Sequence, residues 1–217
     1  DKIAENPDFK MISLGNGEYL AVFTNVDPKR TAVNAKAVYY TLYSNGAWST
    51  PKMIEDDGTL DQYPAIADLG NRGAVITWSS AEQVFTEETS RIAMQNDLNL
   101  HCVFFDKTRK QMSEVQEVTR KTTDSCEDPN YNYSDYSADV AANISYNDNK
   151  MIIYYQKKEY SAGTTEYLGD VLFPEVSVMA ARTYDFKESN GTEGTWETYT
   201  QAELTELENA LKEAGLN

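Results

Sequence analysis

The chain has 217 residues, 41% of them hydrophobic, and its 19 Lys and Arg against 35 Asp and Glu give a net charge of −16. That length and hydrophobicity can supply the core of one large domain or two small ones. The negative charge opposes binding to nucleic acid phosphates and to anionic lipid surfaces. No stretch approaches the ~20 apolar residues that span a bilayer. We therefore expect neither nucleic-acid binding nor membrane insertion.

The first elements in chain order are two predicted hairpins that form one four-stranded antiparallel unit over residues 10–54. The turns contain Asn-Gly pairs, at Gly15-Asn-Gly17 and Ser44-Asn-Gly46, and these residues tolerate the positive φ angles of tight hairpins. Apolar and polar residues alternate between the turns, as expected for strands with one buried face. The strands are predicted at residues 10–14, 19–24, 35–43 and 48–54.

Two further copies of this unit follow, at about residues 64–119 and 138–200, with the same order of strands and turns. The strands of the two copies are predicted at residues 64–69, 74–79, 98–106, 112–119, 139–145, 151–156, 176–184 and 195–200. The sequence thus predicts an all-β fold, a β-propeller-like series of three four-stranded antiparallel sheets in one domain over residues 1–200. A β-sandwich made from the same hairpins is the alternative.

The connections within and between the copies differ in length in a regular way. The turns from the first to the second strand of each copy are short, whereas long connections follow the second strand (25–34, 81–97 and 157–174) and the fourth strand (55–63 and 120–137). In an up-and-down meander these long connections emerge at one edge of the sheets. Because function concentrates in such loops, we expect any binding site on this long-loop face.

A different pattern begins after the last predicted strand. Thr200 and Glu203 have the spacing of a helix capping box, and apolar residues then recur at helical spacing up to Ala214. Gly215 can close the helix. We therefore predict a C-terminal α-helix from about 201 to 214, in a separate segment over 201–217.

No cofactor motif is present, but two acidic loops have the oxygen ligands that Ca²⁺ requires. The first contains Asp56, Asp57 and Asp61, with Gly58 allowing a sharp bend. The second runs from Asp124 to Asn130. The alternative is that both loops are ordinary solvated acidic turns.

The connection before the third copy carries a second candidate site, in which Tyr131, Tyr133 and Tyr136 are interleaved with polar residues that include Asp135. Aromatic faces stack on sugar rings while Asn and Asp bind hydroxyl groups. The same composition also suits a protein interface. The alternative is that these tyrosines fold back and hold their own loop in place.

Cysteine and histidine are too few to suggest a common metal or nucleophile site. Cys102 and Cys126 are the two cysteines, and the sequence leaves open whether they form a disulfide or remain two free thiols. His101 is the single histidine and lies within a predicted strand, where we expect it to be a packed or surface residue.

Several residues of the first repeat and the start of the second resemble a known family of repeats. The segment Gly46-Ala-Trp-Ser-Thr-Pro51, then Asp57-Gly58, Asp61, Tyr63-Pro64 and the run ending Trp78-Ser79 resembles the blade repeats of bacterial extracellular β-propellers. Ser189 to Trp196 is similar to a degenerate Asp-box of the sialidase-like superfamily. The resemblance is clearest over residues 10–80 and is traceable to about 200. It implies a secreted or cell-surface protein.

The resemblance does not carry sialidase catalysis with it. Sialidase-like enzymes use an arginine triad, and none of the six arginines of this chain stands in such a motif. We therefore expect a non-catalytic extracellular module that binds a glycan or a protein through its long-loop face. Two alternatives are a fragment of a larger propeller glycoside hydrolase and a structural spacer of a surface protein. Because propellers close with four or more blades, further blades of a longer parent chain or a partner chain are also expected.

Overall fold

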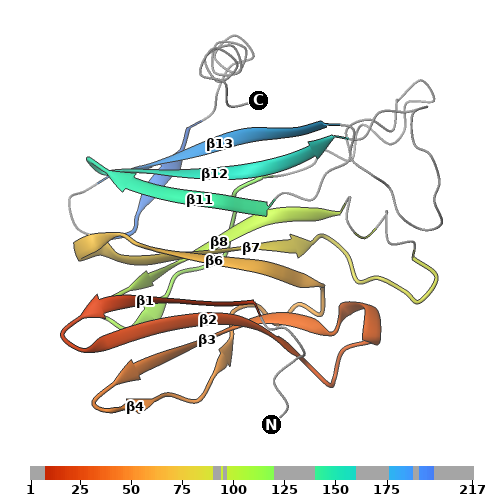
Figure 1. The fold of residues 1–217 in the computed structure, drawn as a ribbon, viewed down its shortest axis with the longest axis horizontal. Coiled ribbons are helices and arrows are strands. Elements are labelled where there is room, and N and C mark those ends of the chain that lie inside the picture. The colour runs from red at the N-terminus through yellow and green to blue at the C-terminus, as the bar shows by residue number, and fades with distance from the viewer. Residues whose placement is uncertain are drawn as a thin grey trace.

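The computed structural model describes residues 8–89, 94, 97–119, 140–159, 176–187 and 191–197. This part of the chain is all-β and forms three antiparallel sheets, A, B and C, that follow one another in the sequence. Figure 1 shows them as three layers, with sheet B between sheets A and C. The prediction of an all-β chain with three successive antiparallel sheets is confirmed. The helix predicted at about 201–214 lies outside the described residues.

Sheet A is a meander in the order β1-β2-β3-β4, and β5 pairs with β3 beyond a break in the last strand. Its elements are β1 (Phe9–Gly15), β2 (Glu18–Val26), the 3-10 helix η1 (Ala32–Asn34), β3 (Lys36–Ser44), β4 (Ala47–Trp48) and β5 (Lys52–Met53). The two tight turns have the predicted Asn-Gly chemistry: φ is 53° at Asn16 and 75° at Gly17, and 53° at Asn45 and 83° at Gly46.

Sheets B and C repeat the meander. Sheet B consists of β6 (Asp61–Asp68), the 3-10 helix η2 (Gly70–Arg72), β7 (Gly73–Ala81), β8 (Leu98–Asp106), β9 (Gln111–Met112) and β10 (Gln116–Glu117). Its β9 and β10 both pair with β8, as β4 and β5 pair with β3. Sheet C consists of β11 (Val140–Asn147), β12 (Lys150–Glu159), β13 (Val176–Phe186) and β14 (Gly194–Trp196).

The break in the last strand of sheets A and B differs from the continuous strands predicted at 48–54 and 112–119, and a serine explains it in both. The hydroxyl of Ser49 accepts a hydrogen bond from the Leu42 amide at 3.0 Å, and the hydroxyl of Ser113 accepts one from the Phe104 amide, also at 3.0 Å. A side-chain oxygen thus replaces a backbone carbonyl in the ladder. The same irregularity at the same place makes the third strand and the broken last strand of the two sheets equivalent.

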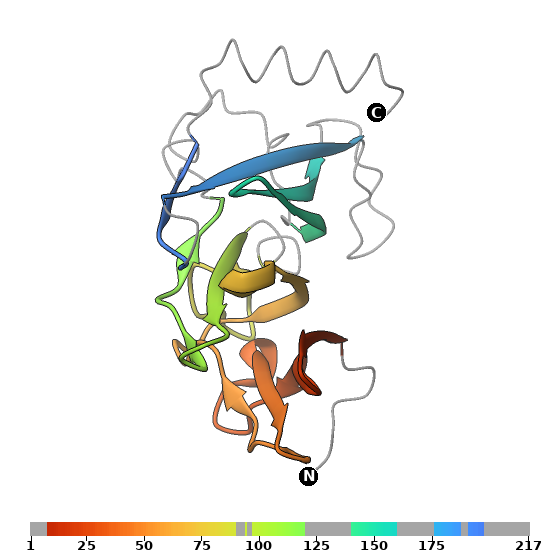
Figure 2. The ribbon, with the colours of Figure 1, turned by 90° about the vertical axis from the view of Figure 1, so that its left-hand side faces the viewer.

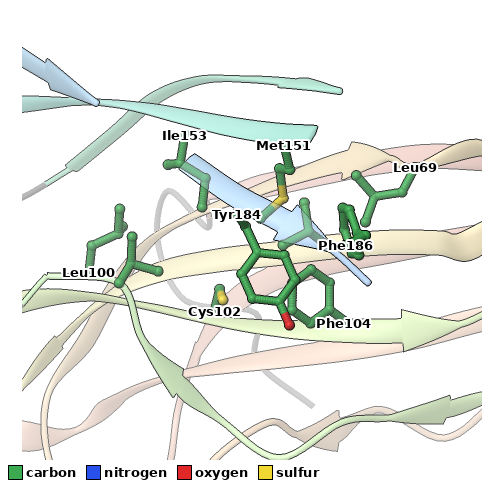
Figure 3. Packing of buried hydrophobic residues seen from close by; sticks show 10 residues of the cluster. Leu69, Leu100, Cys102, Phe104, Met151, Ile153, Tyr184 and Phe186 are labelled. Carbon is green, nitrogen blue, oxygen red and sulfur yellow. The ribbon is translucent and has the colours of Figure 1, made fainter. Parts of the chain in front are cut away.

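Sheet B is covered on both faces, by sheet A on one and by sheet C on the other. Its side chains alternate between the two cores that result. All nine residues of β7 are buried. The core between sheets A and B is formed by Leu14, Leu20, Val22, Val38, Ala74, Ile76, Trp78, Val103 and Phe105. The core between sheets B and C (Figure 3) is formed by Leu69, Val75, Leu100, Cys102, Phe104, Val118, Met151, Ile153, Tyr184 and Phe186.

The free thiol of Cys102 is completely buried in the core between sheets B and C. Burial raises the pKa of this thiol far above its usual value, which leaves it protonated and unreactive. Cys126 lies outside the described residues.

Arg72 fastens sheet B to sheet C at the short-turn edge of the stack. Its side chain donates hydrogen bonds to the Tyr146 hydroxyl at 2.7 Å, the Asn149 side-chain oxygen at 2.7 Å and the Gly191 carbonyl at 2.5 Å. The guanidinium also lies 4.2 Å from the centre of the Phe186 ring. Because Arg72 is only 3% exposed, these contacts compensate the desolvation of its charge.

The first strands of the three sheets lie on one side of the stack. Strand β6 contacts β1 of sheet A and β11 of sheet C, and Figure 2 shows these strands on the side opposite β14. A β-sandwich has two sheets, whereas the described residues form three, so this alternative does not describe the fold. The arrangement also places the connections after β2, β5 and β7 at a common end.

We predict that Gly73→Ala destabilises the protein by about 3 kcal/mol or more. Gly73 has φ of 117°, and a Cβ at this position would lie 1.9 Å from the Phe105 carbonyl oxygen. Gly17→Ala is the matched control, because φ there is also positive but nothing lies within 4 Å, so its cost is about 1–2 kcal/mol. Urea denaturation of both variants tests this, and equal losses of stability would contradict it.

Candidate functional site

Two long connections, the one after β2 and the one from β5 to β6, meet at the side chain of Arg30, which follows β2. This side chain is only 4% exposed. It donates hydrogen bonds to the Thr59 carbonyl and, at 3.2 Å, to the Glu55 carbonyl, both in the connection from β5 to β6. It also lies 3.3 Å from the Met53 sulfur. One arginine therefore fixes the backbone of a connection about 25 residues away to the loop after β2.

Four carboxylates surround the Arg30 guanidinium. The shortest separations between their oxygens and an arginine nitrogen are 3.4 Å for Asp61, 3.7 Å for Asp27, 3.8 Å for Asp57 and 3.9 Å for Asp56. They come from three different segments of the chain. A single buried positive charge thus holds together a cluster of negative charges that would otherwise repel one another.

The structure brings together Asp56, Asp57 and Asp61, the three residues of the predicted calcium loop. Asp57 accepts hydrogen bonds from the Thr59 amide and hydroxyl, and the Asp56 side chain is 78% exposed. Asp61 is the first residue of β6 rather than part of a loop. Among the described residues, no group of three or more metal-ligating side chains is arranged to hold an ion. The positive charge within this cluster comes from Arg30, and calcium binding stays a prediction.

Asp61 is the buried member of the cluster, with 1% exposure. Its Oδ1 accepts hydrogen bonds from the Ser80 hydroxyl at 2.7 Å and from the Trp78 indole at 3.2 Å. Burial raises the pKa of Asp61 to about 7, and the nearby charge of Asp57 adds to this effect, while the bond from Ser80 and the charge of Arg30 oppose it. Asp61 therefore titrates near neutral pH.

His101 in β8 lies beside this cluster. The centres of the His101 and Trp78 rings are 5.9 Å apart, and the rings pack edge to face. Its Nδ1 is 3.6 Å from a carboxylate oxygen of Glu55, which makes the contact an ion pair when the ring is protonated. Burial lowers the pKa of His101, but the carboxylates of Glu55, Glu117 and Glu82 outweigh burial and raise the pKa above its usual value. His101 is thus a packed strand residue, as expected, and it also has an acidic neighbour, Glu55.

Tyr63 is the most unusual residue of the long-loop end. Its φ is 54°, in the left-handed region, which costs a bulky non-glycine residue on the order of 1–3 kcal/mol. It lies in β6 where the register with β7 shifts between Gln62 and Ala65, and its side chain is 42% exposed. Bulges of this kind redirect side chains next to functional sites. Strain and exposure at one aromatic residue make Tyr63 a candidate contact for a ligand.

The predicted aromatic site, Tyr131, Tyr133, Asp135 and Tyr136, lies outside the described residues. The sequence does not reveal the role of Tyr63, because no sequence pattern marks a tyrosine before proline for positive φ. It does not reveal the role of Arg30 either, since the partners of Arg30 lie up to 31 residues away.

Comparison with known proteins adds no family to this description. No protein-family model matches the chain, and no curated protein matches it. In the described part of the chain, no helix has the length and apolar character needed to cross a membrane. The geometry of the described residues therefore carries the functional argument.

We predict that Arg30→Met destabilises the protein by about 3–5 kcal/mol at pH 8, because it leaves buried carboxylates without their counter-charge. Arg109→Met is the matched control, since the Arg109 side chain is 78% exposed beside Asp106 and its loss should cost less than about 1 kcal/mol. Urea denaturation measures both. Equal stability of the two variants would show that Arg30 does not organise the cluster.

We predict that the stability of the wild type falls relative to Asp61→Asn as the pH rises from 4 to 8. The folded-state pKa of Asp61, about 7, exceeds its unfolded value, so folding favours the protonated form. That contribution is fully present below the unfolded pKa and is lost as the pH rises through about 7. The raised pKa of His101 also makes stability fall as the pH rises, but this effect is the same in the wild type and in Asp61→Asn. Thermal denaturation across this pH range tests the difference, and parallel profiles would contradict it.

Proposed function

We propose that this chain is a non-catalytic extracellular binding module with propeller-like sheets, and that it takes a glycan at its long-loop face. Tyr63 is the observation that carries the proposal. The chain holds an exposed aromatic ring in a strained backbone conformation at the end of an inner strand. Strain of this kind persists where the surrounding structure enforces it and the residue has a function.

The propeller-like arrangement is supported by the order and contacts of the sheets. Each sheet is a meander of consecutive strands, and the first strand of sheet B contacts the first strands of sheets A and C. Blades of a propeller are arranged in this way around a common axis. On this interpretation, Tyr63 lies in the innermost strand of the second blade, close to the axis.

The chemistry around Tyr63 favours a ligand rich in hydroxyl groups. Asp56, in the connection that leads into β6, presents an exposed carboxylate at the same end. An aromatic ring with neighbouring carboxylates is the usual combination for stacking on a sugar ring and accepting its hydroxyl hydrogen bonds. The net charge of −16 further favours neutral or basic ligands over anionic ones.

The same geometry favours binding over catalysis. Glycoside hydrolysis requires two carboxyl groups that reach the glycosidic bond. Asp61 has the raised pKa of an acid catalyst, but it is 1% exposed and hydrogen-bonded to Trp78 and Ser80, so a substrate cannot reach it. Arg30 is buried and paired with aspartates, so it cannot bind the carboxylate of a sialic acid. The role of a fragment of a larger hydrolase, or of a spacer, is less well supported.

Tyr131, Tyr133, Asp135 and Tyr136 belong to the sequence segment between sheets B and C and lie outside the described residues. Their role in ligand binding stays a prediction from the sequence, and the structural support for the proposed site comes from Tyr63.

The test uses Tyr63→Gly, which removes the ring and relieves the positive φ. We expect binding to weaken at least about tenfold, equivalent to about 1.4 kcal/mol, while stability stays equal or rises by up to about 1 kcal/mol. Screening the wild-type chain on a glycan array, followed by calorimetric titration of the bound oligosaccharide, measures the first effect. Thermal denaturation measures the second.

Asn45→Gly is the matched control, because Asn45 also has positive φ, at 53°, but lies in a short turn away from the proposed site. This variant should keep full binding. A wild-type chain that binds no oligosaccharide, or a Tyr63→Gly variant that binds as tightly as the wild type, would contradict the proposal.

A further inference from the structure

The outer face of sheet A, which is the face turned away from sheet B, is rich in aromatic side chains. Figure 1 shows sheet A at one end of the stack of three sheets. Leu20 and Val22 of β2 lie in the core with sheet B, so alternation along the strand places Tyr19 on the other side. Strand pairing continues this outer face to Tyr43 of β3 and Trp48 of β4. Trp48 is 48% exposed, and exposed apolar surface of this kind marks interaction sites.

The same face of sheet C carries the same aromatic pair. Tyr43 pairs with Trp48 in sheet A, and Tyr184 pairs with Trp196 in sheet C. Each tyrosine also pairs with the second residue of the strand before it, β2 or β12. The ring centres are 5.2 Å apart with an angle of 59° in sheet A, and 4.9 Å apart with an angle of 62° in sheet C. The two pairs therefore occupy equivalent positions.

In sheet C this aromatic pair is covered by sheet B, which precedes it in the sequence. Tyr184 is only 2% exposed, and its ring centre lies 5.0 Å from that of Phe104 in β8 (Figure 3). The indole of Trp196 donates a hydrogen bond to the Gln116 side chain of β10 at 3.2 Å. Phe104 belongs to the core between sheets B and C, so it lies on the face of sheet B that is turned away from sheet A.

Sheet B packs on sheet A in the same way. Phe105 and Met112 of sheet B correspond to Tyr43 and Trp48, because each pair lies just inside the serine hydrogen bond of its strand break. Phe105 is 1% exposed, and Met112 packs against the same core as Leu20 of sheet A. At both interfaces, therefore, this face is covered by the opposite face of the sheet that comes immediately before in the sequence.

The occupant of the outer face should accordingly be an apolar face of a preceding sheet, and a second copy of this chain does not offer one among its described residues. The suitable faces of sheets A and B are already buried in the two cores. The row of sheet A that packs on sheet B is apolar and includes Ile12, Leu20 and Leu42. The corresponding row on the far face of sheet C consists of Ser145, Ile152 and Thr183. Two of these three positions are polar.

The charges beside the outer face are compatible with burial under another sheet. Arg30, with the aspartates around it, lies 3.3 Å from the sulfur of Met53, which pairs with Tyr39. In sheet B, His101 has the position of Tyr39, and its ring lies 3.6 Å from the carboxylate of Glu55. The covered face of sheet B thus also has a charged margin at the long-loop end.

We propose that the outer face of sheet A is covered by a fourth antiparallel sheet, which precedes sheet A in a longer parent chain. A large apolar side chain of this sheet rests on Tyr43 as Phe104 rests on Tyr184, and its last strand supplies a hydrogen-bond acceptor for the Trp48 indole. The proposal rests on the propeller-like arrangement of the sheets and does not involve Tyr63, so it can fail while the glycan proposal holds.

The experiment compares this chain with the same chain extended at its N-terminus by the residues that its gene encodes upstream, and Trp48→Lys is made in both. In the extended chain the substitution places a charge inside an apolar interface, and we expect the equilibrium constant for unfolding to rise at least about a hundredfold. In the unextended chain Trp48 is 48% exposed, so the rise should stay below about tenfold. Urea denaturation measures both constants.

Val84→Lys is the matched control, because Val84 is 56% exposed in the connection after β7. Its effect on unfolding should be small and equal in the two chains. Hydroxyl-radical footprinting with mass spectrometry gives a second measurement, which needs no substitution. We expect Trp48 to be oxidised readily in the unextended chain and to be protected in the extended chain.

Three results would overturn the proposal. The first is an upstream sequence that adds no four-stranded antiparallel sheet to the extended chain. The second is equal accessibility of Trp48, or an equal effect of Trp48→Lys, in the two chains. The third is protection of Trp48 in the unextended chain. A second copy then covers the outer face if sedimentation equilibrium shows association, and another part of the chain itself covers it if the chain is monomeric.

Discussion

Burial of strand β7 on both faces is the constraint on which the rest of the structure depends. One set of its side chains, including Ile76 and Trp78, completes the core with sheet A, and the other, including Val75, completes the core with sheet C. A strand with two apolar faces cannot be satisfied by a single partner sheet. The chain therefore stacks its three meanders, and every loop position at the ends of the sheets follows from that stacking.

The stacking creates an electrostatic problem at the long-loop end that Arg30 resolves. The turn into β6 carries Asp56, Asp57 and Asp61, and it must pass close to Asp27 in the loop after β2. Without a counter-charge, these carboxylates would repel one another and Asp61 would be buried alone, at a cost of several kcal/mol. Arg30 offsets part of this negative charge and at the same time donates hydrogen bonds to two backbone carbonyls, so the electrostatics and the geometry of the loop both depend on one side chain.

Much of the architecture could be predicted because it depends on local chemistry. Asn-Gly turns and alternating apolar residues specify a hairpin through interactions between residues close in the sequence. The first four-stranded unit, over residues 10–54, could be predicted for this reason. The strand breaks at Ser49 and Ser113 could not be predicted, since a serine hydroxyl replaces a backbone acceptor only when the strands are already paired. The Arg30 cluster depends on contacts between distant segments, and the conformation of Tyr63 depends on a register shift. Such features arise from the assembled sheets and leave no periodic signal.

The three tryptophans make the three layers of the stack distinguishable by fluorescence. Each sheet carries one: Trp48 in sheet A, Trp78 in sheet B and Trp196 in sheet C. Their surroundings differ, since Trp48 is 48% exposed, Trp78 is fully buried, and the indole of Trp196 is half-buried and donates a hydrogen bond to Gln116. Indole fluorescence shifts to shorter wavelength as its surroundings become less polar. The intrinsic emission of this protein is therefore a sum of three distinguishable reporters, one for each layer, and it can follow the order in which the layers come apart.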